Sequence, residues 1–245
     1  MSSASRRRSS GSARWSRTSN EPSRRPPAGG SSPAGTRGTS GWSRDVGDAS
    51  RAARLVIVSG PSGAGKSTVV KRLLADCPLP LVLSVSATTR APRPGEADGV
   101  DYHFLSHDEF RRRREAGEFL ECMEVFGRGD WYGTLRSTVA SGLAAGKWIL
   151  LEIDVQGAMS VLESYPQAVT IFIHPGSLEE LERRLRHRGS ETEASIRRRL
   201  EVARAELDYV PRYRHTVVNH QPQQAAQDIC QLLMSAGESE ACTTS

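Results

Sequence analysis

The sequence predicts an α/β fold in which helices wrap a parallel β-sheet, and three observations support this prediction. Strongly apolar runs of strand length recur along the chain, for example at 55–58 and 148–153. Segments with helical periodicity separate these runs, an alternation that favours parallel strands joined by helical crossovers. Glycines follow the first run, and two carboxylates, Glu152 and Asp154, lie at the end of the second, at the strand ends where such sheets collect their ligands.

The predicted elements follow one another from Leu55. Each strand is a run of aliphatic residues, and each helix repeats apolar residues every three or four positions. Ser177 with Glu180 forms a capping box before one helix, and Ser190 with Glu193 is a candidate cap for the next. The other elements are a strand at 55–58, a helix to about 75, a short apolar stretch at 81–85, a helix at 108–117, strands at 148–153, 169–173 and 217–218, and a C-terminal helix.

The chain divides into a basic extension and one domain. Residues 1–54 hold 11 basic and 3 acidic residues among Ser, Gly, Pro and Ala, with too few aliphatic side chains for a core. We therefore predict a disordered extension at 1–52 and a folded domain at 53–240. A targeting peptide and weak, non-specific contact with polyanions are alternative roles for the extension. No specific nucleic-acid partner is expected.

Hydropathy and cysteine usage bear on the compartment. No apolar run is long enough to span a bilayer, and no secretory h-region is present, so we expect neither a membrane span nor export. The cysteines form no C-x-x-C pair, which favours reduced thiols over a disulfide framework or a zinc site. We therefore predict a cytoplasmic location. The cysteines are Cys77, Cys122, Cys230 and Cys242.

A phosphate-binding loop follows the first apolar run. Residues 60–68 match G-x-x-x-x-G-K-[ST] between a predicted strand and a predicted helix, the context that this motif requires. Its glycines let backbone N–H groups point at phosphate oxygens, at the positive end of the helix. The sheet is thus expected to be of the P-loop NTPase type, with a plain Gly/Ser turn as the alternative. The predicted ATP-binding residues of the loop are Gly60, Pro61, Ser62, Gly63, Ala64, Gly65, Lys66, Ser67 and Thr68.

Several side chains near this loop have chemistry of their own. Lys66 is placed to reach the β- and γ-phosphates of a nucleoside triphosphate, and the Ser67 hydroxyl to ligand Mg²⁺. Glu152 and Asp154 lie two apart at the end of another strand, so both carboxylates point to one face near the sheet edge. Asp154 is our candidate for a second Mg²⁺ contact, direct or through water. A salt bridge to an arginine is the alternative for either carboxylate.

Arginines concentrate in two further segments. Residues 84–96 combine hydroxyl groups with Arg90 and Arg93, and guanidinium groups capture phosphate in a planar, bidentate manner. In the second segment, 182–199, helical spacing puts Arg184 and Arg188 on one face, one turn apart. Composition alone leaves a solvated polar loop open for the first segment and favours a solvated helix face for the second.

Taken together, several separated motifs resemble the guanylate kinases, which phosphorylate GMP with ATP. The resemblance covers residues 55–233. It implies a GMP-binding insertion at about 86–134 and a mobile lid at about 182–202. The motifs are residues 59–68, Ser86-Ala87-Thr88-Thr89-Arg90, Arg93-Pro94-Gly95-Glu96, Asp101-Tyr102-His103-Phe104, Phe119-Leu120-Glu121, Tyr132-Gly133-Thr134, Glu152-Ile153-Asp154-Val155-Gln156-Gly157, Arg188-Gly189 and residues 196–199.

The resemblance implies a complete GMP site. Glu121 matches the residue that reads guanine: one carboxylate accepts from N1–H and from the exocyclic N2–H₂, whereas adenine offers neither donor. Thr134 is expected to contact the base through its hydroxyl. Glu152, where the family usually has Asp, is expected to contact the guanine or its neighbours. The positions that match the family's phosphate-holding residues are Ser86, Arg90, Arg93, Tyr102 and Tyr132.

The resemblance also implies how transfer is achieved. Arg184, Arg188 and Arg199 match the family's lid arginines, and we predict that they act in catalysis with Lys66. Asn219 is predicted to lie near the adenine of ATP. Because the attacking phosphate oxygen of GMP or dGMP is already an anion, in-line transfer from ATP with Mg²⁺ needs no general base.

Two other functions are compatible with this type of fold. A guanylate-kinase-like scaffold module binds protein partners, typically after losing phosphate-binding residues, whereas Lys66, Arg90 and Arg93 are all present here. A kinase for another phosphorylated sugar or nucleotide is the second alternative, and the pair of Glu121 and Thr134 argues for guanine against it. The sequence leaves open the oligomeric state.

Overall fold

The computed structural model describes residues 54–124, 129–187 and 192–241. Three predictions fall outside these ranges: the extension at 1–52, the lid residue Arg188 and the reduced thiol of Cys242. Within these ranges, no helix has both the length and the apolar character needed to cross a membrane.

The larger sheet confirms the predicted α/β class. In the described residues it has five strands in the order β2-β7-β1-β8-β9, and every pairing is parallel. The fully buried β1 (Leu55–Ser59) lies between β7 (Trp148–Glu152) and β8 (Val169–His174). The outer strands are the short β2 (Leu81–Leu83) and β9 (His215–Val218). Because parallel strands end at one edge, the loop after β1 lies beside the carboxylates after β7.

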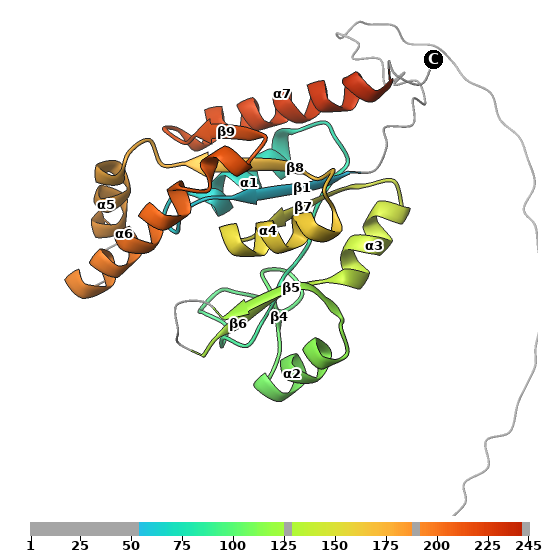
Figure 1. The fold of residues 1–245 in the computed structure, drawn as a ribbon, viewed down its shortest axis with the longest axis horizontal. Coiled ribbons are helices and arrows are strands. Elements are labelled where there is room, and N and C mark those ends of the chain that lie inside the picture. The colour runs from blue at the N-terminus through green and yellow to red at the C-terminus, as the bar shows by residue number, and fades with distance from the viewer. Residues whose placement is uncertain (1–53, 125–128, 188–191, 242–245) are drawn as a thin grey trace, which may run out of the picture. The chain divides into compact units, whose positions relative to one another are not determined.

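Helices cover both faces of this sheet (Figure 1). On one face α1 (Lys66–Asp76) packs with α7 (Pro222–Ala241), and on the other lie α3 (Arg136–Ala144) and α4 (Val155–Ser164). Burial on both faces explains why the inner strands read as continuous aliphatic runs. Neither α3 nor α4 is predicted from the sequence. A 3₁₀ turn at Val210–Arg212 precedes β9.

A second, smaller sheet forms within the predicted insertion. In the described residues its order is β4-β3-β6-β5, with β3 parallel to β4 and the other pairs antiparallel. α2 (His107–Glu115), which the sequence predicts, covers this sheet. The strands of this sheet are not predicted from the sequence; β3 and β4 have only two residues each, too few to show alternation. They are β3 (Ala87–Thr88), β4 (His103–Phe104), β5 (Phe119–Glu124) and β6 (Trp131–Leu135).

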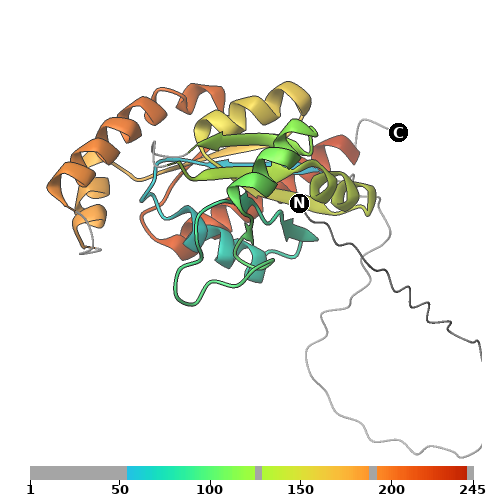
Figure 2. The same ribbon diagram turned by 90° about the horizontal axis from the view of Figure 1, so that it is seen from below.

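Two helices, α5 (Leu178–His187) and α6 (Glu193–Leu207), extend beyond the end of the larger sheet (Figure 2). They pack on each other through aliphatic side chains. The Glu180 N–H donates to Ser177 Oγ at 3.2 Å, which confirms the predicted cap of α5. The N-cap of α6 is Thr192, so the prediction of Ser190 for that position is wrong.

A disulfide bond joins Cys77 to Cys230, so the prediction of reduced thiols is wrong for this pair. Cys77 is the C-cap of α1 and Cys230 lies on α7, with their Cα atoms 5.6 Å apart. Because 153 positions separate the two residues, their spacing along the chain does not reveal the pairing. The packing of α1 on α7 brings them together. Cys122 is the free cysteine of the described residues.

Candidate active site

The phosphate loop leads from β1 into α1 at the carboxyl edge of the larger sheet. Gly60 and Gly65 have φ angles of 143° and 89°. A Cβ on Gly60 would lie 2.3 Å from the carbonyl oxygen of Ile173, so the neighbouring strand leaves no room for a side chain. Gly65 is the N-cap of α1 in the left-handed conformation. This backbone curl at a helix N-terminus is what anion binding by such a loop requires.

Lys66 folds back over the loop from the first position of α1. Its Nζ donates to the carbonyl oxygens of Gly60 at 2.6 Å and Pro61 at 3.2 Å. An ammonium group has three donors on a flexible stem, so it can exchange these carbonyl groups for phosphate oxygens. The Lys66 ammonium therefore lies beside the backbone N–H groups of the loop.

The side chains of Ser67 and Glu152 are in contact. Ser67 Oγ donates to Glu152 Oε1 at 2.5 Å, which joins the first turn of α1 to the end of β7. The register of the sheet places Val58 beside Glu152 and so brings this carboxylate next to the phosphate loop. Two hard oxygen ligands at this separation suit Mg²⁺, which takes further ligands from phosphate and water. Glu152 is thus better placed for a metal than for a base.

A cleft of about 710 Å³ lies between the larger sheet, the smaller sheet and α6. Its walls bring together the greater part of the predicted GMP residues and part of the phosphate loop. Thr134 is fully buried behind this wall. The predicted site residues that line the cleft are Gly60, Ser62, Lys66, Ser86, Arg90, Arg93, Tyr102, Glu121, Tyr132, Glu152 and Asp154.

Glu121 is a buried carboxyl group in the wall of this cleft. It faces Thr134 across β5 and β6, and Thr134 Oγ1 donates to Glu121 Oε1 at 2.7 Å. Burial raises the pKa of Glu121 to about 7; the Thr134 hydrogen bond opposes this rise and the Asp154 carboxylate adds to it. A buried carboxylate is costly unless it meets donors. The geometry therefore suits a ligand that offers two adjacent N–H groups.

Asp154 lies beside Glu121. One of its carboxylate oxygens accepts from the Gly157 N–H at 2.7 Å and caps α4. A Cβ on Gly157 would lie 3.0 Å from Glu121 Oε2 and 3.2 Å from Asp154 Oδ1, so both carboxylates converge over this glycine. These contacts put Asp154 near Glu121 and Glu152 near the phosphate loop. They favour the reverse of the two roles expected from the sequence.

Arg90 is held by side chains around it. Its Nε donates to the Tyr132 hydroxyl at 3.2 Å, and one terminal nitrogen donates to Glu96 Oε1 at 3.0 Å. The guanidinium also lies 5.4 Å from the centre of the Tyr102 ring. Glu96 accepts from the backbone N–H of Arg93 at 2.7 Å, and the Arg90 guanidinium lowers the Glu96 pKa. Glu96 therefore positions both arginines, a role that the sequence analysis does not assign.

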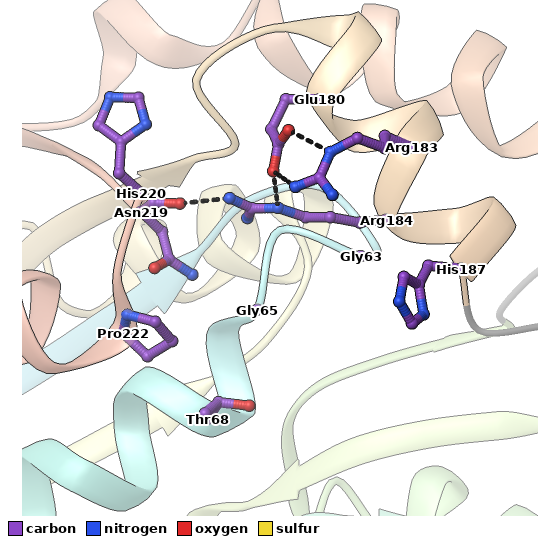
Figure 3. Close-up of a pocket in the computed structure, with 10 residues that line it drawn as sticks. All are labelled: Gly63, Gly65, Thr68, Glu180, Arg183, Arg184, His187, Asn219, His220 and Pro222. Carbon is purple, nitrogen blue, oxygen red and sulfur yellow. Dashed lines mark hydrogen bonds and ion pairs between the residues drawn. The ribbon is translucent and has the colours of Figure 1, made fainter.

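A second cavity, of about 380 Å³, borders later residues of the phosphate loop (Figure 3). Asn219 is buried and donates through Nδ2 to the Ala64 carbonyl at 2.7 Å, whereas its Oδ1 lacks a partner among the described residues. Arg184 donates to the Asn219 carbonyl oxygen and to Glu180, each at 2.7 Å. A planar guanidinium and an amide suit a flat base. The cavity is lined by Gly63, Gly65, Thr68, Glu180, Arg183, Arg184, His187, Asn219, His220 and Pro222.

The arginines predicted to belong to a lid differ in their surroundings. Arg184 faces the second cavity, and Arg199 is half-buried on α6. Arg198, which is not among the arginines that match the family's lid, is exposed but lines the larger cleft. The helical spacing of Arg198 from the apolar residues of α6 could have identified it. Those residues pack on α5, and the opposite face of α6, which carries Arg198, meets the cleft. Arg188 lies outside the described residues.

Comparisons with known proteins point to one family. A model of the guanylate kinase family matches residues 52–236. The chain is 59% identical over 191 residues to a guanylate kinase of Rhodopirellula baltica, which covers 78% of this chain and 91% of the relative. It is 47% identical over 181 residues to one of Clostridium perfringens, covering 74% and 82%. A solved guanylate kinase structure from Anaplasma phagocytophilum matches with a TM-score of 0.63 at 35% identity, covering 76% and 87%.

Proposed function

Because the chain belongs to the guanylate kinase family and phosphorylates GMP to GDP with ATP, we propose how its two cavities divide this reaction. One observation carries the proposal: Gly60 and Lys66 of the phosphate loop line the larger cleft, whereas Gly63 and Gly65 line the smaller cavity. A triphosphate along the loop would have its base in the smaller cavity and its terminal phosphate in the cleft. The cleft then receives GMP.

Glu121 is assigned to the guanine of GMP. Its carboxylate would accept from N1–H and N2–H₂, with Thr134 fixing one carboxylate oxygen and Asp154 beside it. The two ligand donors would offset the cost of ionising a buried carboxyl group. This assignment uses no contact to the ribose 2′-hydroxyl, so dGMP is also expected to react. The GMP phosphate is assigned to Ser86, Arg90, Arg93, Tyr102 and Tyr132.

The smaller cavity is assigned to adenine. The unpartnered Oδ1 of Asn219 is an acceptor suited to an exocyclic amine, and Arg184 supplies a planar guanidinium beside it. This places Arg184 on the base of ATP, while Arg188 and Arg199 stay candidates for contact with the transferring phosphate. Residues 60–68 would hold the phosphates of ATP through the backbone of the loop.

Ser67 and Glu152 are assigned to Mg²⁺. Their oxygens already meet at the phosphate loop, and such a cation would neutralise part of the charge on the phosphates of ATP. Asp154, which the sequence analysis favours as the metal residue, is assigned to the guanine side because of its proximity to Glu121.

The chain's own residues would achieve transfer by positioning and charge. The arginines around Tyr102 would aim the GMP phosphate at the terminal phosphate of ATP, and Lys66 would stabilise the charge that develops between them. No side chain needs to remove a proton, because the nucleophile is an anion. Closure of an insertion at about 86–134 and a lid at about 182–202 would exclude water. A cytoplasmic location stays a prediction.

Coupled ADP formation tests this function. The purified chain receives ATP and Mg²⁺ with GMP, dGMP, AMP, UMP or CMP in separate reactions. The proposal expects strong turnover with GMP, detectable turnover with dGMP and little with the other three. Comparable turnover with AMP or a pyrimidine nucleotide would contradict the proposed reading of guanine by Glu121.

A further inference from the structure

The larger cleft contains a carboxyl group that the assigned reaction does not use. Glu206 lies in the last turn of α6 and lines the cleft together with Ser62 and Lys66. It belongs to a stripe on one face of α6, defined by helical spacing. The other face packs against α5, which fixes the orientation of the stripe. The stripe consists of Arg198, Val202, Ala205 and Glu206, and Tyr209, just after the helix, lines the cleft beside it.

Glu206 reaches two groups of the phosphate loop. The backbone N–H of Ser62 donates to its carboxylate, and the Lys66 ammonium acts on it electrostatically. Its Oε2 is buried and has no hydrogen-bond partner in the part of the chain that the structure describes. Burial raises the Glu206 pKa to about 7; Lys66 opposes this rise and Asp154 adds to it. A half-satisfied buried carboxyl group is costly, so stability alone does not explain its position.

We propose that Glu206 is a latch that holds α6 on the empty phosphate loop and that ATP displaces it. The phosphate oxygens of ATP need the Ser62 N–H, which donates to Glu206, and the charge of the Lys66 ammonium, which acts on Glu206 electrostatically. A carboxylate and a polyphosphate that compete for one donor and one cation repel each other, so the two cannot occupy this place together. Displacement would release α6, which carries Arg198 and Arg199, to close over the bound phosphates.

Glu206 is therefore a positioning residue, because it acts through Lys66 and α6 and does not contact the reacting atoms. The inference rests on the proposed binding of ATP phosphates to the loop. It predicts that a neutral side chain of the same shape removes the competitor. ATP should then bind more tightly, while GMP, which occupies the far part of the cleft, should bind as before.

Calorimetric titration with ATP and Mg²⁺, in the absence of GMP, tests the latch. Glu206→Gln is compared with the wild type and with Glu201→Gln, which makes the same charge change at an exposed position of α6 outside the cleft. Glu206→Gln weakens the contact of residue 206 with the Ser62 N–H, which competes with ATP, and should therefore tighten ATP binding by about five- to tenfold. The control should bind ATP like the wild type.

Steady-state kinetics separate the latch from a structural role. If Glu206 is a latch, Glu206→Gln should have a lower KM for ATP and an unchanged KM for GMP. If Glu206 makes only a structural contact, the same substitution should lower thermal stability and raise both KM values. The latch would be overturned if Glu206→Gln bound ATP no more tightly than the wild type. The assignment of ATP to the loop would still stand if Lys66→Ala no longer bound ATP. Wild-type ATP binding by Lys66→Ala would overturn both.

Discussion

Glu121 and Thr134 lie directly opposite each other on β5 and β6, and the Thr134 hydroxyl donates to the Glu121 carboxylate at 2.7 Å. The pair is buried, and the second oxygen of Glu121 approaches Gly157 at the start of α4. One oxygen is thus fixed by the smaller sheet while the group faces the cleft. This relationship makes Glu121 an acceptor that only a ligand with suitable donors can satisfy.

GMP binding should depend on pH through Glu121. Burial raises the Glu121 pKa from 4.5 to about 7, and the neutral acid cannot accept from both guanine donors. KM for GMP should therefore fall as pH rises from about 6 to about 8 and then level off, whereas Glu121→Gln should retain only the dependence due to the GMP phosphate, whose second pKa is about 6. Identical pH profiles for the two proteins would contradict the assigned role.

The same shift has a consequence for stability, with a defined sign. The folded protein holds a proton on Glu121 up to about pH 7, whereas the unfolded chain releases it near 4.5. The contribution of Glu121 to the free energy of unfolding is therefore full below about pH 4.5 and is lost as pH rises through about 7. Urea unfolding of the wild type and Glu121→Gln across this range measures the difference.

Glu96→Gln should weaken GMP binding without abolishing turnover. Glu96 holds the Arg90 guanidinium and the Arg93 backbone, so its loss should misalign the groups that we propose to bind the GMP phosphate. We expect KM for GMP to rise about tenfold, with a smaller change in kcat. Asp108→Asn is the matched control, because Asp108 makes an exposed ion pair on α2. A larger fall in kcat than rise in KM would show that Glu96 acts on the transfer step itself.

Ser67→Ala and Glu152→Gln should each raise the Mg²⁺ concentration required for half-maximal activity. The two side chains meet at 2.5 Å, and the loss of either should cost about tenfold in apparent metal affinity. Their effects should not add in the double variant, because they act on one site. Asp154→Asn should leave the Mg²⁺ requirement unchanged and raise KM for GMP. The opposite result for Asp154 and Glu152 would restore the roles expected from the sequence.

Cys77→Ser should destabilise the protein in non-reducing buffer. The disulfide with Cys230 closes a long loop, and its removal should lower the free energy of unfolding by about 2 to 4 kcal/mol. Cys122→Ser, at the free cysteine, is the control. Dithiothreitol should bring the wild type to the stability of Cys77→Ser and leave that variant unaffected. A wild type that is insensitive to dithiothreitol would argue against the bond.

Local signals account for what could be predicted from the sequence. The buried strands β1, β7 and β8 are mostly apolar runs, and the phosphate loop follows β1 in its required context. Their alternation with helices sufficed for the fold class. The positions of Glu121 and Arg90 in the cleft agree with the expected GMP site, although their roles in binding stay proposals.

Contacts between distant segments account for what could not be predicted. Glu152 meets Ser67 across 85 positions, and Cys77 meets Cys230 through helix packing. No spacing rule in the sequence connects either pair. The sequence does not single out Glu206 for a related reason, since only the packing of α6 on α5 decides which face of α6 meets the cleft.

The ratio of kcat/KM for GMP to that for AMP, in the wild type and in Glu121→Gln, is the most direct test of guanine recognition. Glu118→Gln, at an exposed position before β5, serves as the control. Loss of two charge-assisted hydrogen bonds should lower the ratio by about 10² to 10⁴ in Glu121→Gln and leave it unchanged in the control. A ratio that survives in Glu121→Gln would show that another residue reads the guanine.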